Sequence, residues 1–179
     1  MGTENTIDGV SFFMEYKDIV IPLFVGFAGT VTGAAVAYFS TIAADNKKSK
    51  AQAETLECSL LAEISALQKI MEGRNYLDIA KNIIEELVSD TEGATRSMTI
   101  LIPDHYSRIY QANAQNIGVL KASTASSIVM FHQLIDSVVQ DVKPGGILNA
   151  GEGGKLAAFS ECAGILNAAL ILGRSLAPD

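Results

Sequence analysis

The sequence predicts an all-α protein, with one N-terminal transmembrane helix followed by an antiparallel bundle of four to five helices. The first observation is a run of 26 residues, from Ile19 to Ala44, that contains no Asp, Glu, Lys, Arg or His. The second is that apolar residues recur at steps of three and four through most of the remaining chain, as on one face of an amphipathic helix. The third is that the pattern offers no set of segments that would pair as β-strands.

The apolar run is long enough to cross a bilayer, because a helix needs about 20 apolar residues to span the hydrocarbon layer. Pro22 lies in its first turn, where the missing N–H would have no partner within the helix. The alternative is a cleaved signal peptide, with Ala35-Val36-Ala37 as the cleavage site. Such a peptide begins basic and has about 7–15 apolar residues, whereas this chain begins acidic and its run is longer. We therefore expect a retained anchor.

The charges on either side of the run predict its orientation. Residues 1–18 carry four acidic side chains against one lysine, whereas three lysines, at positions 47, 48 and 50, follow the run with only Asp45 against them. Positive residues are retained on the cytoplasmic side of a membrane. The prediction is an inner-membrane protein with an external segment 1–18, a span 19–44 and a cytoplasmic domain 45–179.

Small residues form one stripe along the predicted span, at Gly26, Gly29, Gly33 and Ala37. Such a stripe lets two helix backbones approach closely in lipid, as in GxxxG dimers. It indicates a seam at which copies of the chain form a homo-oligomer. The alternative is that Gly is simply frequent in membrane helices.

The composition of residues 45–179 narrows the class of partner. This domain carries 16 acidic and 12 basic side chains, which argues against a basic surface that binds nucleic acid. Cys58 and Cys162 lie far apart in the sequence, and we expect both as free thiols on inner helix faces in a reducing cytoplasm. Two cysteines and two histidines at scattered positions do not match a zinc site.

The first two helices of the domain are expected at Asp45–Glu72, continuous with the span, and at Tyr76–Val88. Gly73 is expected to end the first, and Asn75 to cap the second. Glu63 is expected on the outer surface of the first helix. The apolar stripe of that helix comprises Leu56, Leu60, Ile64, Leu67 and Met71, widened by Cys58, Leu61 and Ile70.

A third helix is expected at His105–Ile117, with Asp104 as its N-cap. A fourth follows and ends before Pro144; the two helices run together through Gly118 in an alternative interpretation. The fourth has the clearest pattern of the domain, a seam typical of bundles. That seam comprises Ile117, Leu120, Thr124, Ile128, Phe131, Ile135, Val138 and Val142.

The last helix is expected at Gly154–Ala177, with Leu156 on its inner side. Its uncharged run between Glu161 and Arg174 is too short for a second span. Three connections complete the domain: a mobile loop at 89–97, an extended tether packed on the helices at 98–102, and a flexible glycine-rich connection at 144–154.

The stretch DHYSRIY, residues 104–110, is the most polar and aromatic part of the domain. Aromatic residues and arginine dominate the energetics of binding surfaces. His105, Tyr106, Arg108 and Tyr110 therefore form a candidate patch for a partner or ligand. The alternative is the start of a helix that carries two core tyrosines.

No pattern in the sequence indicates catalysis, a cofactor or a metal. The glycine-rich GGILNAGEGGK is not a P-loop, because Asn149 stands where a glycine is required and Leu156 where a hydroxyl is required. The Glu-x-x-His pattern of di-iron bundles and a nucleophile elbow are both missing. His132, at the edge of an apolar stripe, is interpreted as structural. We expect no enzyme, no cofactor and no metal site.

Four stretches carry a resemblance: LLAEISAL (60–67), ILIPDHY (100–106), YQANAQNIGVL (110–120) and IVMFHQLID (128–136). In them the chain resembles a loose group of uncharacterised bacterial proteins that have one N-terminal membrane helix and a cytoplasmic helical domain. The resemblance implies this topology and no activity.

Three function hypotheses follow from the sequence. The leading one is a membrane-anchored interaction or scaffold module with an unknown cytoplasmic protein partner. The second is a membrane-bound sensor or stress-signalling component that binds a partner or a small ligand through residues 104–110. The third is a helical-bundle enzyme, which the missing catalytic patterns disfavour.

Overall fold

The structure is a computed structural model that describes the backbone of residues 9–178 and the side chains of residues 30, 33–34 and 36–178. Contacts divide the chain into two units, residues 1–50 and 51–179. The predicted boundaries at 18/19 and 44/45 are not tested by this division and remain predictions.

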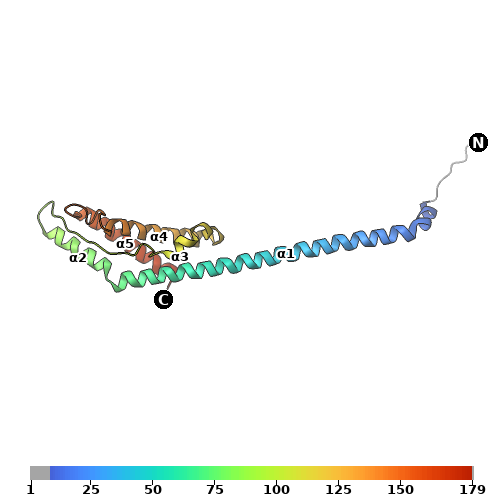
Figure 1. The fold of residues 1–179 in the computed structure, drawn as a ribbon, viewed down its shortest axis with the longest axis horizontal. Coiled ribbons are helices and arrows are strands. Elements are labelled where there is room, and N and C mark those ends of the chain that lie inside the picture. Colours follow the sequence, from blue (N-terminus) through green and yellow to red (C-terminus); the bar gives the residue numbers. More distant parts are fainter. Residues whose placement is uncertain (1–8, 179) are drawn as a thin grey trace, which may run out of the picture. The chain divides into compact units, whose positions relative to one another are not determined.

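The elements in order are helix α1 (Gly9–Gly73), α2 (Tyr76–Ser89), α3 (Arg108–Asn113), the 3-10 helix η1 (Ala114–Val119), α4 (Ala122–Val142) and α5 (Leu156–Leu176) (Figure 1). Within residues 9–178 the only β-type pairing is one isolated bridge, between Arg96 and Gly154. The all-α prediction is therefore confirmed for the part of the chain that the structure describes.

Helix α1 contains the predicted span 19–44 and the predicted helix that follows it, and it ends at Gly73 as expected. Leu60, Ile64 and Met71 of its apolar stripe are buried. Asn75 does not cap α2 with its side chain: its backbone is left-handed, with φ of 54°. An asparagine tolerates this conformation, which here serves the tight turn from α1 to α2.

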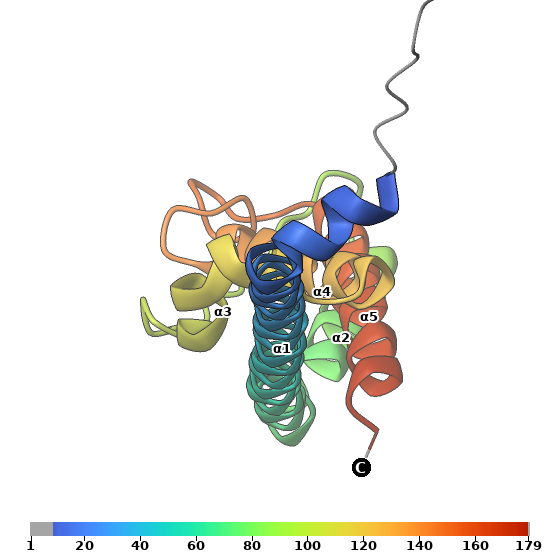
Figure 2. The ribbon, with the colours of Figure 1, turned by 90° about the vertical axis from the view of Figure 1, so that its right-hand side faces the viewer.

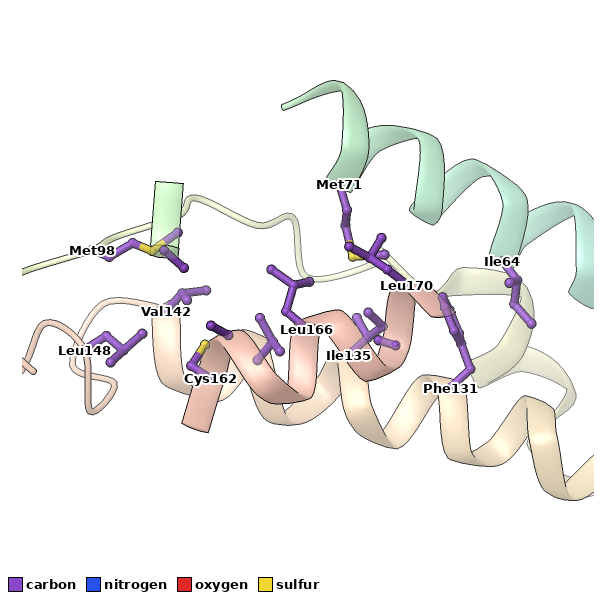
Figure 3. Close-up of a cluster of buried hydrophobic side chains, with 14 of the residues drawn as sticks. Ile64, Met71, Met98, Phe131, Ile135, Val142, Leu148, Cys162, Leu166 and Leu170 are labelled. Carbon is purple, nitrogen blue, oxygen red and sulfur yellow. The ribbon is translucent and has the colours of Figure 1, made fainter. Parts of the chain in front are cut away.

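The core of the second unit forms where α5 packs against both α2 and α4 (Figure 2). Figure 3 shows Met71 of α1 above Leu170 of α5, and Ile64 of α1 beside Phe131 of α4. The residues of the predicted seam are buried, except that Thr124 is only half-buried. Ile117 and Leu120 lie in η1 and directly after it, because α4 begins only at Ala122. The buried members of the seam are Ile117, Leu120, Ile128, Phe131, Ile135, Val138 and Val142.

The third helix is shorter than predicted. It begins at Arg108 rather than His105, and Asp104 does not cap it, because residues 104–107 form turns in which the Tyr106 N–H donates to the carbonyl of Pro103. Proline at 103 favours an extended or turn conformation around it. The helix then tightens into η1, which ends at Val119, so the third and fourth helices do not run together.

The segment before Pro103 is extended and packs on the helices, as predicted for the tether. Its alternate N–H groups, those of Arg96, Met98 and Ile100, donate to backbone carbonyls at 3.0–3.1 Å. These bonds supply the hydrogen-bond partners that the backbone of an isolated extended segment requires. Figure 3 shows Met98 in the same part of the buried cluster as Val142 and Leu148, which supply two of those carbonyls. The acceptors are Gly154, Leu148 and Val142.

The connection 144–154 is not a solvated flexible linker, because it is bonded to the domain and partly buried. Leu148 is 0% exposed. A Cβ at Gly146 would lie 2.3 Å from the carbonyl oxygen of Gln140, and one at Gly153 would lie 2.3 Å from that of Arg96. The glycines are thus required for close backbone approach, rather than for mobility.

Arg96 also restrains the loop 89–97, which we had predicted to be mobile. Its guanidinium lies 3.2 Å from the Glu86 carboxylate and 2.8 Å from that of Asp90. The hydrogen bond from Thr91 N–H, followed by the hydrogen bond from Arg96, lowers the pKa of Asp90. Both ends of the loop are therefore tied together through one side chain.

Among the described residues, α5 is the one helix that is long and apolar enough to cross a membrane, by length and composition alone. We excluded a second span because the uncharged run between Glu161 and Arg174 is short. That exclusion by length is wrong for the whole helix, which runs for 21 residues and includes both charged side chains. Leu156, predicted inside, is 37% exposed. The helix nevertheless buries one face in the domain, as the core helix of a globular protein does, and Leu176, also predicted inside, is half-buried. The buried residues of α5 are Phe159, Cys162, Ala163, Leu166, Ala169, Leu170 and Gly173.

Asn149 holds the connection 144–154 against the end of α4. Its Nδ2 donates to the carbonyls of Lys143, at 2.7 Å, and Val142, at 3.1 Å, and its Oδ1 accepts from Gly145 N–H at 2.7 Å. The side chain thus satisfies carbonyls that have no partner within the helix.

We expect Asn149→Ala to lower the free energy of unfolding by about 1–3 kcal/mol, because it leaves several backbone groups without partners. The denaturant dependence of Cys162 labelling, measured in a Cys58→Ser background, would report this unfolding, since Cys162 is buried. Asn167→Ala, at an exposed position of α5, is the matched control. Equal midpoints for the two variants would contradict the role of Asn149.

Candidate functional site

An apolar pocket of about 310 Å³ lies within the second unit. It is lined by the end of α1 and the turn after it, the start of α2, the extended segment 98–103, α4 and α5, and it is partly open to solvent. The lining residues are Leu67, Ile70, Met71, Arg74, Tyr76, Ala80, Met98, Ile100, Leu101, Ile102, Pro103, Tyr106, Ile135, Val138, Val139, Val142, Cys162 and Leu166.

Two parts of the pocket lining occupy little space, Ala80 and the extended segment 98–103. Ala80, on the inner face of α2, is 2% exposed and presents only a methyl group. The wall at 98–103 is a single extended segment, whose backbone faces α4 rather than filling the space as a helix would. Leu101, in that segment, is 82% exposed. The pocket is therefore apolar inside and bordered by a solvent-exposed leucine.

Two polar side chains of the pocket lining lie where α1 turns into α2. Nη1 of Arg74 donates to the hydroxyl oxygen of Tyr76 at 3.2 Å. Within the part of the chain that the structure describes, Arg74 has no carboxylate partner, whereas Arg174 forms an ion pair with Glu72 at 2.8 Å. Arg74 thus keeps most of its five N–H donors available to an acceptor.

A third polar group, Tyr106, lies where the pocket adjoins a wider, more open cleft of about 840 Å³. Its hydroxyl donates to a carboxylate oxygen of Asp136 on α4. Burial raises the pKa of Asp136. An acidic group therefore lies in the adjoining cleft beside Tyr106, whereas Arg74 is the basic side chain of the pocket lining.

Cys162 contributes a thiol to the pocket wall, but not a nucleophile. Burial, followed by the nearby Asp141 carboxylate, raises its pKa to about 12. The thiolate is the reactive form of cysteine, so this group remains a small apolar wall residue near neutral pH. Cys58, which we expected on an inner face, is exposed, and both cysteines are free as expected.

A buried polar cluster lies outside the pocket, where α1, α3 and α4 meet. Its centre is Glu63, which we predicted on the surface but which is 8% exposed. Its two carboxylate oxygens accept the backbone N–H groups of Ile109, at 2.6 Å, and Tyr110, at 2.9 Å. Glu63 thus supplies the N-terminal capping of α3 that Asp104 does not, because a carboxylate satisfies the unpaired first N–H groups of a helix.

His132 lies against this cluster and is 1% exposed. Its ring stacks on Tyr110, with centroids 3.9 Å apart and planes 13° from parallel. Nε2 is 3.9 Å from Oε2 of Glu63, and neither ring nitrogen has a hydrogen-bond partner within the described residues. Burial lowers the pKa of His132 to about 4. The histidine is therefore neutral at pH 7, in agreement with its interpretation as structural.

The structure distributes the four predicted patch residues over different environments. Tyr106 lines the pocket and Tyr110 stacks on His132, whereas His105 and Arg108 are exposed. They do not converge on one site, because the turns at 104–107 change the direction in which successive side chains point. Whether His105 and Arg108 contact a partner stays a prediction.

The predicted seam in the span is only partly described. Gly26 and Gly29 lie outside the residues whose exposure the structure describes. Gly33 and Ala37 are exposed, and a Cβ at Gly33 would meet nothing within 4 Å. The homo-oligomer seam therefore stays a prediction.

Sequence reasoning did not find the pocket or Arg74. Two signals were present: Ala80 is the one small residue on an inner face otherwise made of leucine and isoleucine, and Arg74 directly follows the helix end at Gly73. Residues 30–178, where described, contain no group of three or more His, Cys, Asp or Glu side chains arranged to hold a metal ion.

Comparisons with known proteins returned no match: no protein-family model, no curated protein and no solved structure is similar to this chain. The suspected resemblance to bacterial single-pass membrane proteins therefore stays an expectation.

The pKa of His132 predicts a pH dependence of stability. The unfolded chain binds a proton near pH 6.5, whereas the folded chain binds it only near pH 4, so the free energy of unfolding falls as the pH is lowered between these values. The loss amounts to about 3 kcal/mol at its largest. Chemical denaturation across this range would measure it.

The variant His132→Phe retains an aromatic ring against Tyr110 but cannot bind a proton, so we expect a flatter dependence of stability on pH. His105→Gln, which alters the exposed histidine, should retain the slope of the parent protein. If His132→Phe and the parent protein lose the same free energy between pH 6.5 and pH 4, another group causes the dependence.

Proposed function

We propose that this chain is a single-pass membrane protein whose helical domain binds a small apolar molecule in the pocket between α1, α2, α4 and α5. The observation that carries the proposal is the pocket of about 310 Å³, lined almost entirely by apolar side chains. Sites for small molecules measure about 300–1,000 Å³ and combine apolar walls with few polar groups. This proposal develops the sensor hypothesis, in which the domain binds a small ligand, rather than the scaffold hypothesis.

The apolar walls supply a driving force for binding. Water in the pocket finds few hydrogen-bond partners, because Arg74, Tyr76 and Tyr106 are the main polar side chains of the lining. An apolar ligand that replaces this water is favoured by about 25 cal/mol for each Å² of apolar surface removed from solvent. The described geometry offers no activated nucleophile, since the Cys162 thiol stays protonated, so binding rather than catalysis fits the site best.

The membrane anchor is the second part of the proposal. Residues 19–44 are helical within α1 and contain no Asp, Glu, Lys, Arg or His. The lysines at 47, 48 and 50 support a cytoplasmic location for the domain and an external location for the N-terminus. The stripe of Gly26, Gly29, Gly33 and Ala37 supports self-association of the chain in the membrane.

The arrangement of the domain as an antiparallel bundle belongs to the same proposal. Only two residues separate α1 from α2, and packing of α5 against α2 and α4 gives these helices one common core. Short connections of this kind favour antiparallel neighbours.

Cys58 provides a native test of the proposed orientation, because it is exposed whereas Cys162 is buried. We expect a membrane-impermeant maleimide to leave Cys58 unlabelled in intact cells and to label it after the membrane is permeabilised. Cys58→Ser should remove the signal in both conditions. Labelling of Cys58 in intact cells would place the domain outside and contradict the proposal.

The pocket itself can be tested with a neutral probe. We expect a diazirine derivative of decanol to label peptides of α2, α4 and α5 in the full-length chain in nanodiscs. Ala80→Leu should reduce that labelling severalfold, because the larger side chain fills part of the pocket. Ala168→Leu makes the same change at an exposed position of α5 and should leave the labelling unchanged.

Labelling that is equal in both variants would contradict binding in this pocket. It would leave the interaction module, with a protein partner, as the better supported function.

A further inference from the structure

We propose that the ligand of this pocket is a medium-chain carboxylate, an amphiphile with one negative charge, whose head binds Arg74 and Tyr76 and whose chain fills the apolar interior. The inference rests on the proposed function and adds to it the chemical class of the ligand.

The hydrogen bond between Arg74 and Tyr76 leaves a set of donors at one end of the pocket. The Tyr76 oxygen accepts from Nη1 of Arg74, so the hydroxyl hydrogen of Tyr76 is left to donate elsewhere. The other N–H groups of the guanidinium are donors as well, and arginine has no acceptor. A carboxylate, which only accepts hydrogen bonds, matches this set, and its bonds to arginine are among the strongest in proteins.

The start of α2 supports a negative charge at the same end. The helix begins at Tyr76, and no side chain caps its first N–H groups. The positive end of the helix dipole therefore faces the turn that carries Arg74. Asp78, in the same first turn, contributes one exposed negative charge. The balance of charges favours one negative charge on the ligand rather than the two of a phosphate monoester.

The surroundings of Tyr106, the third polar side chain of the lining, disfavour the reverse orientation. There Tyr106 already donates its hydroxyl to Asp136, and a ligand carboxylate would meet an acidic group. Most of the remaining lining is apolar, with Met71, Val138 and Leu166 among its side chains. The head of the ligand therefore belongs at Arg74 and its chain belongs among the walls.

The volume sets the length of the chain. A water molecule occupies about 30 Å³ of the liquid, and a methylene group is of similar size. A pocket of about 310 Å³ therefore holds roughly ten such groups. A saturated carboxylate of that length, decanoate, is the probe that fits best.

The test compares two photoreactive probes that differ only in the head group: diazirine derivatives of decanoate and of decanol, applied to the full-length chain in nanodiscs. We expect decanoate to label the pocket peptides at lower concentration than decanol. Arg74→Gln should raise the half-saturating concentration of decanoate about tenfold, a change equivalent to about 1.4 kcal/mol, and should leave that of decanol unchanged.

Two further variants refine the test. Tyr76→Phe retains the aromatic ring but removes one donor, and should weaken decanoate binding by a smaller factor. Arg108→Gln removes an exposed arginine that does not line the pocket, and should have no effect. Unchanged binding of decanol to Arg74→Gln verifies that the variant is folded.

Equal labelling by the two probes, unaffected by Arg74→Gln, would overturn the carboxylate inference and leave the proposed apolar binding site standing. No labelling of the pocket peptides by either probe would overturn both. A loss of decanoate binding in Arg108→Gln but not in Arg74→Gln would also contradict the inference, and would indicate a site at residues 104–110.

Discussion

The pocket depends on one constraint, the backbone pairing of the extended segment 96–100 with the end of α4 and the connection that follows it. The N–H groups of Arg96, Met98 and Ile100 are satisfied there, so the segment needs no helical hydrogen bonds of its own. A helix in this place would fill the space between α2 and α4. The extended segment is thinner, and the unfilled volume becomes the pocket.

Much of the fold follows from the sequence alone. The seam of α4 could be predicted because its apolar residues repeat at helical spacing, and nearly all of them are buried. Glu63 was wrongly predicted on the surface, since periodicity alone does not reveal a buried carboxylate that caps a helix distant in the sequence. His132 was interpreted as structural, but its position beside Glu63 was not predicted. The third helix was predicted too long, because the turns after Pro103 interrupt an otherwise helical pattern.

The candidate site was less accessible to sequence reasoning than the fold. Tyr106 was selected as part of an aromatic patch, and it does line the pocket, but its neighbours His105 and Arg108 are exposed elsewhere. Arg74 was overlooked because its position next to Tyr76 and the walls of the pocket arises from packing among α1, α2, α4 and α5. A cavity is a property of tertiary structure, and no single segment encodes it.

The left-handed backbone of Asn75 has a consequence for the binding of a ligand in the proposed pocket. The turn between α1 and α2 requires the left-handed conformation of Asn75. This conformation is unfavourable for an L-residue, and its free-energy cost is offset when the domain folds. The turn brings Arg74 and Tyr76 close together, and Nη1 of Arg74 donates to the hydroxyl oxygen of Tyr76 at 3.2 Å. The proposed ligand would therefore bind without a rearrangement of this turn, and little conformational entropy of the backbone would be lost on binding.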